Sequence, residues 1–126
     1  NTDDIKVAAF AKQSGIRARA VSLKNCERIT DRAIAALARN CTHLRKFYCS
    51  GCPLVTDSAI THLLSVCPQL QFVYLSNNAR LTCETFIHCG GCQHMYKIYL
   101  GSAREECKAT IRRLLRSHSN IHAARC

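Results

Sequence analysis

The sequence predicts an α/β fold, a right-handed superhelical solenoid of about four to five repeats with a parallel sheet on its concave face. The first observation is a helix that runs directly into a strand within residues 55–75. Apolar residues there follow helical spacing at Ile60 and Leu63, and strand spacing at Leu70 and Val73. The second is that this unit recurs. Because one unit cannot bury its apolar side alone, the copies are expected to stack.

Five segments of the chain align on the expected strand, with a period of 25 or 26 residues. Their apolar positions follow the pattern L-x-x-L-x-L-x-x-C/N, which is typical of leucine-rich repeats. In that architecture each repeat is a short strand followed by a return helix. The aligned positions are Ala18-Val21-Leu23-Cys26, Leu44-Phe47-Cys49-Cys52, Leu70-Val73-Leu75-Asn78, Met95-Ile98-Leu100-Ala103 and Ile121-Ala124-Cys126.

The return segments also align, because residues 29–41 match residues 55–67 in the pattern [IV]-T-D-x-x-I-x-x-L-x-x-x-C. The Thr-Asp pair is expected to begin each helix. Its side-chain oxygen would accept hydrogen bonds from free amides, and its carboxylate would lie at the positive end of the helix dipole. Later repeats depart from this pattern, since Cys83 replaces the aspartate and the segment around Cys107 lacks the pair.

Residues 1–17 contain a predicted helix that begins near Thr2-Asp3-Asp4 and ends at Gly15. This helix is expected either to cap the solenoid or to be the return helix of a preceding repeat. Residues 18–126 are expected to form the leucine-rich-repeat domain, because no linker rich in proline or glycine divides them.

The motif C-x-x-[IV]-T-D-x-x-I-x-x-L-x-x-x-C-x-x-L resembles the cysteine-containing leucine-rich repeats of F-box proteins, the substrate receptors of cullin-type ubiquitin ligases. The resemblance covers about residues 16–126. It implies a non-enzymatic protein-interaction module that recognises substrates in an F-box-type ubiquitin ligase receptor. A weaker resemblance is to mitochondrial coupling factor B, which is also small and basic. It implies a structural or assembly subunit of the ATP synthase or the respiratory chain.

Charge narrows the class of partner. Eighteen Lys and Arg against eight Asp and Glu give a net charge of +10, which favours an acidic partner. No apolar run approaches the roughly 20 residues that span a bilayer. Nucleic acid is disfavoured because the sequence has no reading helix, zinc finger or base-stacking module. We therefore expect a protein partner with an acidic or phosphorylated surface, within a multi-subunit complex. A second basic area near Arg112 fits a binding surface for an acidic partner and, equally well, the solvent-exposed face of a helix.

The ten cysteines raise the question of a metal site. The densest group, CETFIHCGGCQH at residues 83–94, contains the C-x-x-C spacing of a zinc knuckle. However, Cys92 occupies the same repeat position as Cys41 and Cys67, so these thiols are predicted to belong to the core. The sequence therefore predicts no metal and no cofactor.

Other features of the sequence also favour structural thiols. Cys26, Cys52 and Asn78 share one turn position, where their side chains are expected to bond the backbone. Free thiols indicate an intracellular reducing compartment, either cytoplasm or nucleus, with the mitochondrial matrix as the alternative. No Cys-His pair or glycine-rich phosphate loop stands apart from the repeat, so the chain is not expected to be an enzyme.

The outward positions of the predicted strands form the candidate binding surface. Equivalent positions line up across stacked parallel strands, and three of the four tyrosines fall in one such row. Tyrosine supplies rigid amphipathic contact area and neighbouring lysines supply charge, a composition typical of recognition surfaces. The alternative is that these tyrosines only support their cross-strand neighbours. The predicted partner-binding residues are Lys46, Tyr48, Phe72, Tyr74, Lys97, Tyr99 and Arg125.

Overall fold

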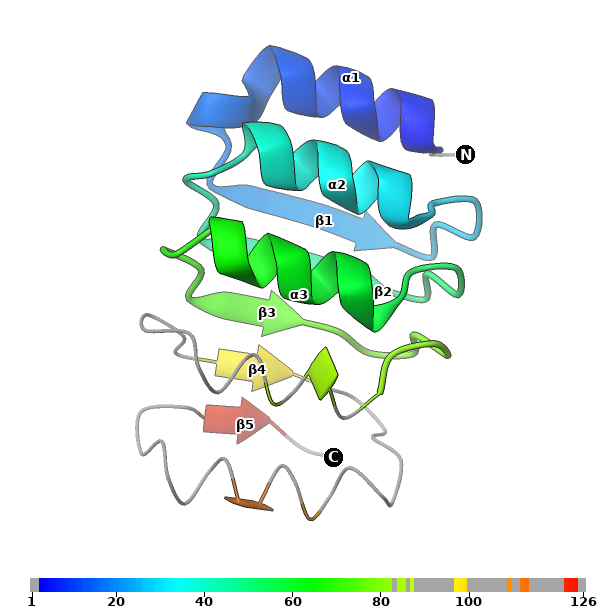
Figure 1. Ribbon diagram of the computed structural model, residues 1–126, viewed down its shortest axis with the longest axis vertical. Coiled ribbons are helices and arrows are strands. Elements are labelled where there is room, and N and C mark those ends of the chain that lie inside the picture. The colour runs from blue at the N-terminus through cyan, green and yellow to red at the C-terminus, as the bar shows by residue number, and fades with distance from the viewer. Residues whose placement is uncertain are drawn as a thin grey trace.

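The computed structural model describes residues 3–82, 84, 85, 87, 97–99, 109, 112, 113 and 122–124. It confirms a leucine-rich-repeat type of α/β solenoid (Figure 1). Five parallel strands form one sheet in the order β1-β2-β3-β4-β5. The strands are β1 (Ala20–Lys24), β2 (Lys46–Ser50), β3 (Phe72–Tyr74), β4 (Lys97–Tyr99) and β5 (His122–Ala124). The helices are α1 (Asp4–Ser14), α2 (Asp31–Asn40) and α3 (Asp57–Val66), with a short 3-10 helix, η1 (Gly15–Arg17), after α1.

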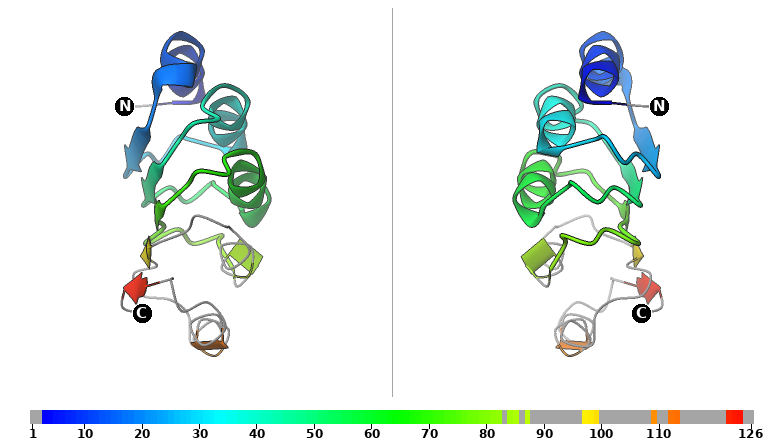
Figure 2. Two further views of the ribbon diagram at one scale, coloured as in Figure 1. Left: turned by 90° about the vertical axis from the view of Figure 1, so that its left-hand side faces the viewer. Right: turned by 90° about the vertical axis from the view of Figure 1, so that its right-hand side faces the viewer.

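Strands and helices form two separate layers. Figure 2 shows the sheet along one side of the molecule and the helices along the other. In the helix layer, α1 packs on α2 and α2 packs on α3. The core lies between the layers, where residues at equivalent repeat positions, such as Ile34 and Ile60 or Leu37 and Leu63, are fully buried. Phe47 of β2 is the largest side chain buried among them.

The register confirms the predicted alignment of the first four strands. Val73 of β3 lies opposite Phe47 on one side and Ile98 on the other. The predicted alignment of the fifth strand is wrong by one residue, because Ala123 rather than Ala124 lies opposite Ile98. Strand β5 (HAA) has no large apolar side chain to fix its register from sequence. As a result, Ala124 takes the position beside Tyr99 that had been assigned to Arg125.

The Thr-Asp pairs act mainly between repeats. Asp4 accepts hydrogen bonds from the Thr30 backbone amide at 2.8 Å and from its hydroxyl at 2.5 Å. Asp31 accepts the same pair from Thr56, also at 2.8 and 2.5 Å. The sequence interpretation, which assigned each pair to its own helix, is therefore only partly right. Thr30 does cap α2 by accepting from the Arg32 amide, whereas the Thr56 side chain accepts no such capping bond.

The next Asp–Thr contact along the chain, between Asp57 and Thr82, is joined by an additional hydrogen bond. Asp57 accepts from the Thr82 amide at 2.8 Å and from the Thr82 hydroxyl. It also accepts from the Thr85 hydroxyl at 2.5 Å. Thr85 is fully buried, so its hydroxyl needs this partner.

Helix α1 has the same relation to α2 that α2 has to α3. Its Asp4 holds Thr30 as Asp31 holds Thr56. The helix ends at Ser14, one residue before the predicted end, and Gly15 continues into η1 with an ordinary helical φ of -47°. Glycine is needed there because a Cβ atom on Gly15 would lie 2.5 Å from the Asn40 carbonyl oxygen. Close packing of two helix ends therefore selects this residue.

Each of the first three strands leads into a turn with a left-handed residue. Asn25, Gly51 and Asn77 occupy equivalent positions and have φ values of 53°, 66° and 58°. Asparagine and glycine are the residues that adopt this conformation most readily. The following position in the third repeat is Asn78, whose amide nitrogen donates to the Cys49 carbonyl at 2.6 Å and whose oxygen accepts from the Cys52 amide at 2.9 Å. The predicted role of Asn78 in bonding the backbone is confirmed.

The Asp-Thr bonds predict a specific stability loss. We expect Asp31→Ala to lower the free energy of unfolding by about 2–4 kcal/mol, because it removes two charge-assisted bonds from a partly buried site. Glu27→Ala is the matched control, since Glu27 is an exposed acid in the neighbouring loop. Urea unfolding of both variants measures the difference. Equal losses in the two variants would contradict a special role for Asp31.

Asp57 is expected to make stability depend on pH. Burial disfavours its charged form, but the hydrogen bonds from Thr82 and Thr85 outweigh burial and hold the pKa of Asp57 below its ordinary value of 3.8. The folded protein thus binds fewer protons at this site than the unfolded chain does, and the stabilisation is present above pH 3.8 and lost as the pH falls through the folded-state pKa. The stability difference between wild type and Asp57→Asn should therefore shrink on acidification below 3.8 in urea titrations. A difference that stays constant with pH would refute this account.

Candidate protein-binding surface

The outward side chains of β2 and β3 form an aromatic surface on the concave face. The register pairs Tyr48 with Tyr74 and Lys46 with Phe72. The same register continues to β4, where Tyr99 lies opposite Tyr74. Tyr48, Tyr74 and Tyr99 therefore share one row across three strands, which we call the tyrosine row. This arrangement follows directly from the one-period spacing of the three residues.

The side chains of this surface hold one another in place. The rings of Tyr48 and Tyr74 lie 6.0 Å apart between centroids with an interplanar angle of 39°, which is a favourable tilted geometry. The Lys46 ammonium lies 5.3 Å from the centre of the Phe72 ring, within cation-π range. The three rings are only partly buried. The surface is thus ordered by its own contacts and still open to a partner.

The described charges on this face are positive. The outward positions of β1, β2 and β3 include Lys24 and Lys46 and carry no acidic residue. Exposed Arg19 and Arg45 precede β1 and β2, and their carbonyls accept backbone bonds from the following repeat. The sequence interpretation missed these two arginines, although their spacing of one repeat could have identified them. An anionic segment on the sheet would meet cations along its edge.

The predicted binding residues differ in how far the structure describes them. Lys46, Tyr48, Phe72 and Tyr74 lie together with their side chains in contact. Lys97 and Tyr99 lie in register with Phe72 and Tyr74, and the structure describes their backbone. Arg125 lies outside the described residues, and the observed register places Ala124 beside Tyr99 instead.

The described cysteines are structural thiols. Cys26, Cys41, Cys49, Cys52 and Cys67 are all free, and every one except Cys26 is buried. The Cys67 thiol donates to the Cys41 carbonyl of the previous repeat at 3.3 Å, and the Cys52 thiol donates to the Leu23 carbonyl at 3.6 Å. The predicted bonding of Cys26 is also present, since its thiol donates to the Lys24 carbonyl at 3.4 Å. The Cys52 and Cys67 thiols therefore join repeats through backbone carbonyls, whereas the Cys26 bond is local.

Burial shapes the acidity of these thiols. Burial raises the pKa of Cys41, and burial together with the neighbouring Cys41 raises the pKa of Cys67 to about 11. A sulfur-sulfur hydrogen bond between Cys49 and Cys52, reinforced by burial, raises the pKa of Cys49. Among the described residues, no three His, Cys, Asp or Glu side chains are placed to hold a metal ion. The C-x-x-C segment at Cys89 and Cys92 lies outside the described residues.

Within the described residues, none of the helices has both the length and the apolar character required to cross a bilayer.

Comparison with known proteins identifies fold neighbours. No protein-family model and no curated protein sequence matches the chain. A structure of leiomodin-1 actin-binding site 2 matches with a TM-score of 0.72 and 14% sequence identity, covering 99% of this chain and 81% of that one. The tropomodulin C-terminal domain of Caenorhabditis elegans matches with a TM-score of 0.66 and 15% identity, covering 97% and 81%. At such low identity, these matches establish the fold.

The neighbours correct the family resemblance drawn from the motifs. The two neighbours described above are leiomodin and tropomodulin domains, and they contradict the assignment to F-box proteins or to mitochondrial coupling factor B, which is wrong. The physical reason is that the Thr-Asp and cysteine positions serve the stacking of repeats, through bonds such as Asp31 to Thr56 and Cys67 to Cys41. Any solenoid with this repeat geometry can use such bonds, whatever its partner.

Thiol accessibility can be tested directly. In the native protein without reductant, iodoacetamide should modify Cys26 and leave Cys41, Cys49, Cys52 and Cys67 unmodified, because only Cys26 among these five is partly exposed. Unfolding in urea should make all five reactive. Peptide mass spectrometry assigns the sites. Rapid native modification of Cys41 or Cys67 would contradict their core positions.

Proposed function

We propose that the chain is a non-enzymatic protein-binding module whose concave sheet receives an acidic or phosphorylated segment of a partner protein. The observation that carries this proposal is the set of ring contacts on the sheet. Tyr48 and Tyr74 lie side by side, and Lys46 lies over Phe72, on a face whose described outward positions lack acids. The proposed contact set also includes Lys97 and Tyr99, which share this register.

Ring order and charge together favour binding over a purely supportive role. Aromatic side chains on rigid strands lose little conformational entropy when a partner covers them, and such residues are frequent interface anchors. The cations Lys24, Arg19 and Arg45 at the margins would steer an acidic segment and bond its carboxylates or phosphates. An aromatic centre with a charged rim is the usual anatomy of a protein interface.

The fold neighbours supply a first candidate partner. The leiomodin-1 domain is described as an actin-binding site, so actin is the protein to test first. The free thiols of the described core support a reducing compartment such as the cytoplasm or nucleus. Helix α1, whose Asp4 bonds the next repeat as Asp31 does, is proposed to be the return helix of a first repeat. On that proposal, residues 1–17 and 18–126 form one continuous solenoid.

The tyrosine row provides the decisive test. We expect Tyr48→Ala/Tyr74→Ala to weaken partner binding by about 100-fold or more, since truncated anchors at an interface centre cost 2 kcal/mol or more each. Thermal unfolding should change little, because both rings lie on the outer face of the sheet. The measurements are binding to actin and quantitative affinity purification from cell extract. The purification also tests membership of a multi-subunit complex.

Two controls separate the row from general surface effects. Tyr48→Phe/Tyr74→Phe keeps the rings and should retain most of the affinity. Ile16→Ala removes an exposed apolar side chain from η1 and should not alter binding. If actin and every purified partner bind the double alanine variant as well as wild type, the concave face is not the binding surface.

A further inference from the structure

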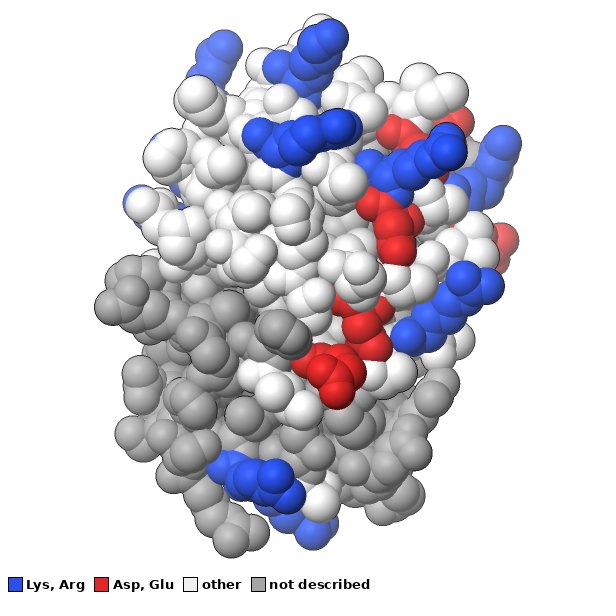
Figure 3. Space-filling view, viewed as in Figure 1, with Lys and Arg blue, Asp and Glu red and all other residues white. Residues whose placement is uncertain are grey.

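A groove runs between α1 and α2 on the helix layer, which is the face turned away from the tyrosine row. Its volume is about 620 Å³. Apolar side chains from both helices form the floor, and arginines from α2 and its preceding loop form one wall. The residues that matter for the argument are Ile5, Ala8, Ala35, Arg28, Arg32 and Arg39. Figure 3 shows basic side chains over the part of this face where α1 and α2 lie.

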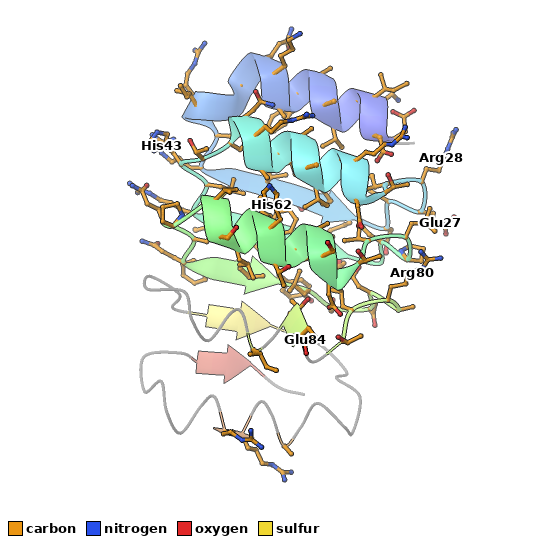
Figure 4. The ribbon with its side chains drawn as sticks, in the orientation of Figure 1. Glu27, Arg28, His43, His62, Arg80 and Glu84 are labelled. Carbon is orange, nitrogen blue, oxygen red and sulfur yellow. The ribbon has the colours of Figure 1, made fainter. Side chains whose placement is uncertain are left out.

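The cations of this groove are available to a partner. Arg28, Arg32 and Arg39 are exposed, and none forms an ion pair with another described residue. Figure 4 shows Arg28 on the loop between β1 and α2. The three guanidinium groups lie along a single wall. The hydrogen bond from the Lys6 amide, together with the charges of Lys6 and Arg28, lowers the pKa of Asp3, so Arg28 interacts with one carboxylate at this end of the groove. Guanidinium forms its strongest contacts with carboxylates and phosphates.

The acids at the same end of the groove are already occupied. Asp3 accepts from the Lys6 amide at 3.0 Å and so caps α1. Both carboxylate oxygens of Asp4 accept from Thr30. The groove is lined by three arginines against these two acids, so it presents net positive charge beside its apolar side chains.

The spacing of the cations indicates an extended acidic ligand. Arg32 and Arg39 are seven residues apart, which places them two turns and about 10 Å apart along α2. A ligand with two acidic groups at that interval can pair with both arginines without drawing their side chains together. A helix with acidic residues seven positions apart presents them at the same interval. Ile5, which is 80% exposed, and the half-buried Ala8 would contact apolar residues between those acids.

We propose that the α1-α2 groove is a second docking site, and that its occupant is an acidic amphipathic helix of a partner protein. The small side chains Ala8 and Ala35 allow a third helix to approach to the usual packing distance of about 8–10 Å. Carboxylates of the occupant bond Arg32 and Arg39, and its apolar stripe covers Ile5. This is the helix-in-groove mode of recognition. The proposal does not depend on the concave face, because the groove lies on the opposite layer.

A designed peptide tests the proposal with the full chain. The probe is a fluorescent helical peptide of roughly 15 residues, with glutamates seven positions apart and leucines between them. We expect it to bind in fluorescence anisotropy and to shift backbone amide NMR signals in α1 and α2. A peptide of the same composition in scrambled order should bind at least about tenfold more weakly, because its acidic residues no longer lie on one face of the helix.

Protein variants separate specific docking from general charge. Arg32→Glu/Arg39→Glu should lower affinity by about tenfold or more. The matched control Arg17→Glu/Arg80→Glu changes charge equally at exposed sites outside the groove and should retain binding. Ile5→Glu should also lower the affinity for the peptide. Because the Ile5 side chain is exposed, this substitution is not expected to unfold the protein. Circular dichroism and thermal unfolding verify that each variant is folded.

Five results would overturn the proposal, and four of them come from the peptide and variant measurements. They are failure of the designed peptide to bind, equal binding of the scrambled peptide, equal losses in the two double variants, and unchanged binding of Ile5→Glu. A fifth is self-association of the chain that Arg32→Glu/Arg39→Glu abolishes, measured by sedimentation velocity. That result would assign the groove to a second copy of this chain instead of an acidic helix.

Discussion

The hydrogen-bonded contact between an aspartate of one repeat and a threonine of the next is the constraint on which the structure depends. The Asp4–Thr30 and Asp31–Thr56 bonds have the same geometry, and Asp57 extends the series to Thr82. Strands in a sheet lie about 4.8 Å apart, whereas packed helices need about 8–10 Å. The Asp–Thr bonds fix the start of each helix relative to the next repeat. They therefore keep the helix layer aligned with the strand layer although the two layers differ in spacing. Unequal spacing turns the sheet side inward, which makes it the concave face.

The same constraint creates the tyrosine row. Because successive repeats are held in register, residues one period apart become neighbours on adjacent strands. The narrow strand spacing then brings Tyr48 and Tyr74 into ring contact and Lys46 over Phe72. Neither contact needs a local motif in the sequence. Both arise from stacking, so a one-residue shift of any strand would remove them. Strand β5 illustrates the sensitivity, since its observed register exchanges Arg125 for Ala124 beside Tyr99.

The features of the fold that could be predicted from the sequence are those that repeat at a fixed spacing. Apolar spacing identified the strands, and equivalent positions such as Ile34 and Ile60 identified the core. It could not assign the partner of Asp31, because an aspartate after a threonine is also an ordinary helix start. It could not locate the α1-α2 groove either, since the distance between two packed helices depends on side chains from both. The family resemblance failed because residues that serve stacking carry no information about the partner.

The distribution of charge links the two proposed surfaces to the interior bonding. The chain has only eight acidic residues against eighteen basic ones. Asp3, Asp4, Asp31 and Asp57 direct their oxygens at backbone amides or threonine hydroxyls of the fold. Half of the acids thus support the structure through hydrogen bonds. Basic side chains such as Arg32 have no comparable structural partner among the described residues. The excess of basic side chains therefore fits the acidic partners proposed for the sheet face and for the helix face.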